Sequence, residues 1–125
     1  MRSLTLAVFI ASAVLAPTVV TAATLTPVNL TAPLSWTAGD YLFPSQIIAG
    51  YNAPLSQYNA KSWGDHVLSA CKGFSACTSV NVFQATNSGS TGGRFWFGYV
   101  FRGGPTDESF YERVEGVTDS AAWSV

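Results

Sequence analysis

Few residues of this 125-residue sequence have the types and spacing that catalysis requires. His66 is the single histidine, and it stands beside Asp65 in a chain with many serines. A histidine so placed could act as the general base for a serine nucleophile. None of the serines, however, lies in the Gly-x-Ser-x-Gly turn that exposes the nucleophile of many hydrolases. We therefore interpret His66 as a solvent-facing or capping residue, which leaves a hydrolase or an isomerase as the least favoured class.

Four acidic residues near the C-terminus suggest a second chemistry, that of a glycosidase. Asp107 and Glu108 are adjacent, and Glu112 and Glu115 would share one face of a helix. Glycoside hydrolysis uses two carboxyl groups, one as the acid and one as the base or nucleophile. Acidic residues are far more often solvated surface side chains. We therefore expect no catalytic residues and a protein that is not an enzyme. The sequence also contains no nucleotide, zinc-protease or EF-hand motif, so we expect no cofactor.

The two cysteines, Cys71 and Cys77, are predicted to form one structural disulfide. An even pair in an oxidising compartment favours a bridge, and closing so short a loop stabilises a fold by roughly 2 kcal/mol. Their spacing differs from the CxxC motif of redox enzymes. The alternative is a metal site that adds His66, but three ligands without a fourth are a weak zinc signal. We expect no metal.

Residues 1–22 have the form of a secretory signal peptide. Arg2 is followed by the apolar run "LTLAVFIASAVLA", and Val20 and Ala22 supply the small residues before a cleavage site. A membrane anchor is the alternative, but the apolar run is short and Pro17 interrupts it. We predict that residues 23–125 form a single small domain that is secreted and extracellular. We expect no membrane insertion of the mature chain.

The composition limits the partners of this predicted domain. Charged residues make up 10% of the chain and the formal net charge is −1, so the basic surface that nucleic acid requires is missing. Asn29, Leu30 and Thr31 form a glycosylation sequon, which makes Asn29 a candidate for modification on the surface. We expect an extracellular glycan or protein as the partner and no nucleic acid.

The periodicity of the sequence predicts one helix and several strands. Residues 61–74 carry apolar residues at helical spacing, with Ser62 or Asp65 as the N-terminal cap and Gly73 as a left-handed stop. Residues 76–85 and 94–101 are predicted to be strands joined as a β-hairpin. Residues 46–51 are a further predicted strand, residues 23–33 an extended arm or edge strand, and the tail either a short helix or a last strand.

The strand at residues 94–102, "RFWFGYVFR", has two chemically different faces because strand side chains alternate. We assign its odd positions inward, against the helix, because they form an uncharged aromatic row: Phe95, Phe97, Tyr99 and Phe101. The even positions Arg94, Trp96 and Arg102 surround Gly98, and a tryptophan between arginines could stack on a sugar or receive a partner's side chain. These three residues are the candidate ligand-binding site. The alternative is that Trp96 packs under the N-terminal arm.

This order of elements resembles the apple/PAN module, most of all the small secreted apple-like proteins of fungi. A central helix ends near Cys71, Cys77 opens the strand "CTSVNVF", and the aromatic strand "WFGYVF" follows. The resemblance covers roughly residues 60–125. The chain departs from that pattern where Val67 replaces an expected helix cysteine and where the aromatic strand lacks a cysteine near Gly98, which fits the loss of one bridge as a pair.

The resemblance implies an α+β fold in which a short central helix packs on a curved antiparallel β-sheet and is bridged to a strand by one disulfide. It also implies a non-catalytic recognition module that binds carbohydrate or protein outside the cell. An alternative from another class is a small secreted effector or toxin that acts on a host or competitor cell.

Overall fold

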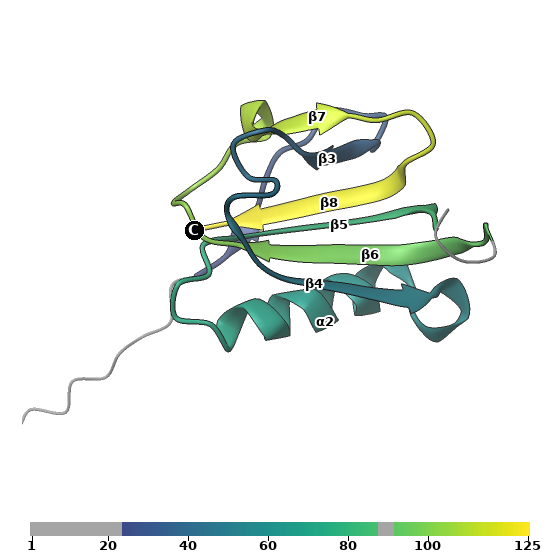
Figure 1. Cartoon of the computed structure of the whole chain (residues 1–125), viewed down its shortest axis with the longest axis horizontal. Helices are drawn as coiled ribbons and strands as arrows, with labels where there is room; N and C mark the ends of the chain where they lie inside the picture. The colour runs from purple at the N-terminus through teal and green to yellow at the C-terminus, as the bar shows by residue number, and fades with distance from the viewer. Residues whose placement is uncertain (1–23, 88–91) are drawn as a thin grey trace, which may run out of the picture.

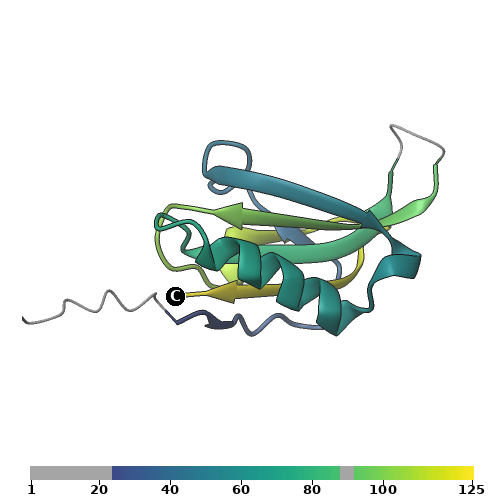
Figure 2. The ribbon, with the colours of Figure 1, turned by 90° about the horizontal axis from the view of Figure 1, so that it is seen from below.

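The computed structural model describes residues 24–87 and 92–125, so the predicted signal peptide lies outside the described residues. The chain has an α+β fold in three layers (Figure 1). Helix α2 (Ala60–Lys72) packs on one face of a five-stranded antiparallel sheet, across which it lies in Figure 2. A small two-stranded sheet packs on the opposite face. No helix within the described part of the chain is long and apolar enough to cross a membrane.

The strands of the larger sheet come from distant parts of the sequence. In spatial order they are β2 (Thr26–Pro27), β8 (Thr118–Ser124), β5 (Ser79–Thr86), β6 (Arg94–Phe101) and β4 (Ile47–Pro54). The smaller sheet pairs β3 (Trp36–Ala38) with β7 (Tyr111–Arg113). Two short 3-10 helices, η2 (Leu55–Gln57) and η3 (Glu108–Phe110), precede α2 and β7.

These elements confirm the predicted α+β class, the central helix and the antiparallel pairing of β5 with β6. The predicted strand at residues 46–51 belongs to β4, and the N-terminal arm supplies the edge strand β2. The C-terminal tail forms the strands β7 and β8 rather than a helix.

The ends of α2 differ from the prediction. Asn59 is the N-cap: its side chain accepts a hydrogen bond from the Ser62 N–H at 2.8 Å, and the Ser62 hydroxyl accepts one from the Asn59 N–H at 2.9 Å. This capping box pairs two backbone donors that the first turn leaves free. Ser62 therefore supports the cap without being the cap, and Asp65 instead pairs with Lys61. Gly73 has a φ of −79°, so it is not the left-handed stop that we predicted.

The predicted disulfide is confirmed. Cys71, in the last turn of α2, is bonded to Cys77, which lies just before β5, and their Cα atoms are 5.5 Å apart. The bridge fixes the end of the helix to the start of the strand on which it packs. Because both thiols are used in the bridge, neither can serve as a ligand in the alternative metal site with His66.

The helix approaches the sheet closely because two glycines face it. A Cβ atom on Gly98 of β6 would lie 2.6 Å from Val67 Cγ2, a distance that real Cβ contacts do not show. A Cβ atom on Gly64 of α2 would lie 2.8 Å from the ring of Trp123. Both contacts therefore require glycine. The helix residues that face the sheet are all buried: Trp63, Gly64, Val67 and Cys71.

The faces of β6 are the reverse of our prediction. Trp96, Gly98 and Val100, the even positions, face α2, and Trp96 and Val100 are 3% and 0% exposed. Of the odd positions, Phe101 alone is fully buried; Phe95, Phe97 and Tyr99 are half-buried on the other face. We predicted that the uncharged aromatic row faces the helix and that Gly98 leaves a gap in the exposed face. Gly98 instead faces the helix. It is the point at which the helix contacts the strand.

We expect replacement of Gly98 by alanine to destabilise the fold by about 1–3 kcal/mol, because the added methyl group overlaps Val67. Val67→Ala removes the overlapping groups, so the double variant should be at least about 1 kcal/mol more stable than the sum of the single changes predicts. Urea unfolding of the four proteins measures this coupling. Val80→Ala, another buried valine of the same cluster, is the control and should combine additively with Gly98→Ala.

The capping box gives a second stability prediction. Asn59→Ala should lower the free energy of unfolding by about 1 kcal/mol, because the Ser62 N–H loses its acceptor. Asn52→Ala changes an exposed asparagine on β4 and should stay within about 0.5 kcal/mol of the wild type. Equal effects of the two substitutions in thermal unfolding would contradict this role of Asn59.

Candidate functional site

The structure places the predicted site residues Arg94, Trp96 and Arg102 apart. The Trp96 ring lies in the core, and its Nε1 donates a hydrogen bond to the Tyr58 carbonyl at 3.0 Å. Arg94 donates to the Gly116 carbonyl at 2.6 Å and to Thr118 Oγ1 at 2.8 Å. Arg102, at the other end of the strand, donates to the Ser45 carbonyl at 3.5 Å. An exposed tryptophan between two arginines is therefore absent, and Trp96 packs, although against η2 and α2 rather than under the N-terminal arm.

The residues considered for catalysis lie on separate elements of the fold. His66 is exposed on α2. The centroid of its ring lies 5.4 Å from that of Trp63 and 5.2 Å from that of Tyr58. Glu112 lies in strand β7 and Glu115 in the turn after it, so the helix face that we predicted for them does not exist. In residues 24–87 and 92–125, no three His, Cys, Asp or Glu residues lie together as metal ligands would.

Two of the acidic residues instead accept hydrogen bonds from backbone N–H groups. The Asp107 carboxylate accepts hydrogen bonds from the hydroxyl and the N–H of Ser109, and these lower the pKa of Asp107. Glu108 Oε1 accepts a hydrogen bond from the Thr31 N–H at 2.6 Å, which holds the pKa of Glu108 below its ordinary value of 4.5. Glu108 thereby ties η3 to the N-terminal segment.

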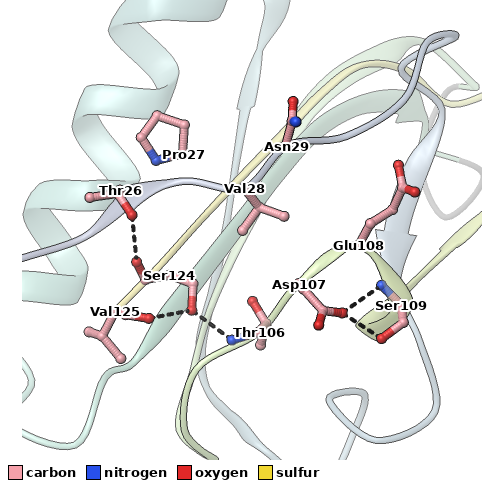
Figure 3. Close-up of a pocket in the computed structure, with 10 residues that line it drawn as sticks. All are labelled: Thr26, Pro27, Val28, Asn29, Thr106, Asp107, Glu108, Ser109, Ser124 and Val125. Atoms are coloured by element: carbon pink, nitrogen blue, oxygen red, sulfur yellow. Dashed lines mark hydrogen bonds between the residues drawn. The ribbon is translucent and has the colours of Figure 1, made fainter.

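A cavity of about 410 Å³ lies beside these acids, between the N-terminal segment and the C-terminal strand (Figure 3). Many of its polar groups already have partners. Ser124 Oγ accepts from the Thr106 N–H at 2.7 Å, and Thr26 Oγ1 donates to the Ser124 carbonyl at 3.4 Å. Asn29, the predicted glycosylation site, also lines it and is exposed; its modification stays a prediction. We therefore interpret this cavity as the space left where these chain segments bond to one another, and not as a binding site.

The more distinctive surface is the sheet face opposite α2. Four rings lie on or beside it, and we call them the aromatic face: Phe43, Phe83, Phe97 and Tyr99. The rings of Phe83 and Phe97 stack with their centroids 5.7 Å apart, and those of Phe83 and Tyr99 with theirs 6.3 Å apart. Phe43, from the loop after β3, meets Tyr99 edge-on at 5.5 Å and is 45% exposed.

Strand register explains how these rings come together. Phe83 of β5 lies directly opposite Phe97 of β6, and Asn81 lies opposite Tyr99. Gly50 of β4 is the other neighbour of Tyr99, whose ring covers it: a Cβ on Gly50 would lie 2.9 Å from that ring. Cross-strand neighbours on one face pack against each other in this way. The positions of the rings are therefore set by the backbone pairing of three strands.

The smaller sheet leaves the aromatic face partly uncovered because its strands are only three residues long. Trp36 and Tyr111, from β3 and β7, cluster with Leu42, Phe101 and Ala122, and these residues bury one end of the sheet face. Tyr99 packs against the side of that cluster and Phe97 lies next along the strand; both rings stay half-buried.

A cavity of about 340 Å³ lies where the aromatic face meets the smaller sheet. Most of the residues that line it are apolar or aromatic. The lining consists of Thr37, Ala38, Phe43, Asn81, Phe83, Ala85, Tyr99, Glu112, Val114 and Val117. An apolar cavity with a few polar groups is the usual form of a binding site.

The polar groups of this cavity are partly unpaired. Asn81 is fully buried, and its Nδ2 donates to the Ala121 carbonyl at 3.2 Å, but its Oδ1 accepts no hydrogen bond. Glu112 is exposed, and within the described chain its side chain makes neither an ion pair nor a hydrogen bond. Partial burial raises the pKa of Tyr99 above its ordinary value of 10.0, so its hydroxyl keeps its proton at neutral pH.

No known protein family, curated sequence or solved structure matches this chain. The sequence did not predict that four residues line one cavity: Phe43, Phe83, Asn81 and Glu112. The signal available for two of them was spacing, since Asn81 and Phe83 have the parity that pairs with Tyr99 and Phe97 across the predicted hairpin.

The Glu108 contact predicts a loss of stability in acid. Because the folded pKa lies below 4.5, this contact stabilises the fold above pH 4.5, and the contribution is lost as the pH falls through the lower folded value. In Glu108→Gln this residue has no charge to lose, so the stability of the variant should fall less between pH 6 and pH 3 than that of the wild type. Thermal unfolding between pH 6 and pH 3 measures it, with Glu115→Gln as the control that should follow the wild type. A Glu108→Gln profile parallel to the wild type would contradict the role of this contact.

Proposed function

We propose that this protein is a secreted, non-catalytic recognition module that binds carbohydrate or protein outside the cell through its aromatic face. One observation carries the proposal. Strand pairing stacks Phe97 and Tyr99 on the buried Phe83, and Phe43 meets Tyr99 from a loop, yet Phe43, Phe97 and Tyr99 are left partly open to solvent beside a cavity. Contiguous exposed apolar surface on a small domain marks binding sites.

The chemistry of the aromatic face suits recognition. Aromatic rings offer a large contact area at a low entropic cost and dominate the energetics of interfaces. Those of Phe83, Phe97 and Tyr99 are preorganised, because each is packed against a neighbouring ring before any partner arrives. Preorganisation reduces the free energy that binding must spend on ordering side chains.

The secreted location and the apple/PAN-like character are part of the same proposal. The disulfide supports an oxidising compartment, because such bridges are rare in the reducing cytosol. A helix packed on an antiparallel sheet, with one bridge from the helix to the start of a strand, supports the resemblance to the apple/PAN module. The signal peptide predicted at residues 1–22 supports export.

We expect the variant Phe97→Ala/Tyr99→Ala to lose binding to partners of the wild-type mature domain. Arrays of glycans and of extracellular proteins would supply the partners. Each truncated ring should weaken binding by about 2 kcal/mol, or roughly 30-fold, because it removes half-exposed contact area. Circular dichroism and thermal unfolding check that the fold is kept.

Two controls separate this surface from others. Phe74→Ala removes a ring that is 38% exposed in the segment after α2, away from the aromatic face, and should leave binding unchanged. Arg94→Ala/Arg102→Ala tests the site predicted from sequence. If a partner binds the folded Phe97→Ala/Tyr99→Ala variant as well as the wild type, the aromatic face is not the binding surface.

A further inference from the structure

We propose that the cavity beside the aromatic face holds a basic side chain, lysine or arginine, of a protein partner. This inference rests on the proposed function and deepens it, because it chooses a protein over a glycan and names the chemical group that enters the cavity. It follows from three properties of the described residues: the sign of their charge, the arrangement of their rings and an unpaired buried acceptor.

The charge of the cavity has one sign. Glu112 is the only charged residue among the described residues that line it, and no lysine, arginine or histidine belongs to that set. The next residue, Arg113, does not neutralise it. Its guanidinium lies 4.4 Å from the centroid of the Trp36 ring and donates a hydrogen bond to the Pro33 carbonyl at 2.6 Å. The carboxylate of Glu112 is therefore available to a cation.

The rings add a second attraction for a cation. Tyr99 and Phe43 meet at 85° and form a corner, while Phe83 lies nearly parallel to Tyr99, at 29°. The faces of aromatic rings carry a negative potential that attracts ammonium and guanidinium groups. The C–H groups of a neutral sugar gain less from ring faces than a full positive charge does, so a corner of rings in a cavity that Glu112 also lines favours a cation.

Asn81 supplies the third property. Its Nδ2 is used by the Ala121 carbonyl, which leaves the unpaired Oδ1 as a partial negative charge in a buried side chain that lines the cavity. An unpaired buried acceptor is unfavourable, and the low local dielectric strengthens its attraction for a positive charge nearby. A cation in the cavity would offset the free-energy cost of this unpaired oxygen.

The rim of the cavity indicates that the cation belongs to a protein. Phe43 and Val114 line the cavity and are 45% and 37% exposed. They would contact the residues that flank a basic side chain in a partner, as apolar rims surround a central anchor in protein interfaces. A free amine or choline would fill the cavity but leave this rim exposed to water, so we expect such small cations to bind more weakly.

Titration of the mature domain with three short capped peptides tests the inference. They share one sequence and differ at the central residue, which is lysine, arginine or norleucine. We expect the basic peptides to bind about tenfold more tightly than the norleucine peptide, with shifts in the NMR signals of the Asn81 side-chain amide, and binding to weaken as salt is added. Choline and a neutral oligosaccharide are the further probes.

Glu112→Gln should weaken binding of the lysine peptide about threefold, and Glu112→Lys should abolish it. Glu115→Gln and Glu115→Lys are the matched controls in the turn after β7, outside the cavity lining, and should bind the peptide as the wild type does. Because Glu112 and Glu115 are both exposed, none of these variants should impair folding.

The outcomes separate this inference from the proposed function. Three results would each overturn the cation site. They are equal affinity for the norleucine and lysine peptides, a higher affinity for choline than for the lysine peptide, and unchanged affinity of Glu112→Lys for the lysine peptide. Binding of the neutral oligosaccharide alone, lost in Phe97→Ala/Tyr99→Ala, would overturn it too but support the proposed function. Failure of every peptide, glycan and protein to bind would overturn both.

Discussion

The close contact between α2 and β6 is the constraint on which the rest of the structure depends. Val67 sits on Gly98, a position where even a methyl group would overlap it. The disulfide at the end of the helix and the capping box at its start fix both ends of the same element. Because the helix is held against the even positions of β6, the odd positions must face the other way.

That orientation produces the candidate site. The odd positions carry aromatic side chains, and the layer available to cover them consists of two strands of three residues. This layer reaches Phe101 but leaves Phe97 and Tyr99 half-buried. A surface of stacked rings with one unpaired carboxylate at its edge is therefore a consequence of where the helix packs and of how little chain remains to cover the opposite face.

Local patterns predicted a large part of this fold. Helical spacing and a cysteine pair indicated α2 and its bridge, and the alternation of β-branched and aromatic residues indicated β5 and β6. The faces of β6 could not be read in this way. Trp96 hides its polar Nε1 by bonding the Tyr58 carbonyl, a partner 38 residues away along the chain. Likewise the pairing of Trp36 with Arg113 joins two very short strands that β4, α2, β5 and β6 separate along the chain, and no local pattern indicates it.

The candidate site was harder to predict because it combines distant segments. Phe43 comes from a loop and Glu112 from a tail that we predicted as either a short helix or a strand, and both reach the cavity only through tertiary packing. The electrostatic character of the cavity depends equally on what is already paired. Asn81 donates through its nitrogen to a neighbouring strand while its oxygen accepts no hydrogen bond, and Arg113 lies over Trp36 on the other face of β7 from Glu112.

The central claim is that β6 buries its even positions under the helix and leaves the aromatic face accessible. Hydroxyl-radical footprinting of the mature domain, read residue by residue by mass spectrometry, tests it most directly. We expect rapid modification of Phe43, Phe97 and Tyr99, and protection of Trp96 and Trp63, although tryptophan is intrinsically the more reactive residue. Rapid modification of Trp96 together with protection of Phe97 would contradict the account.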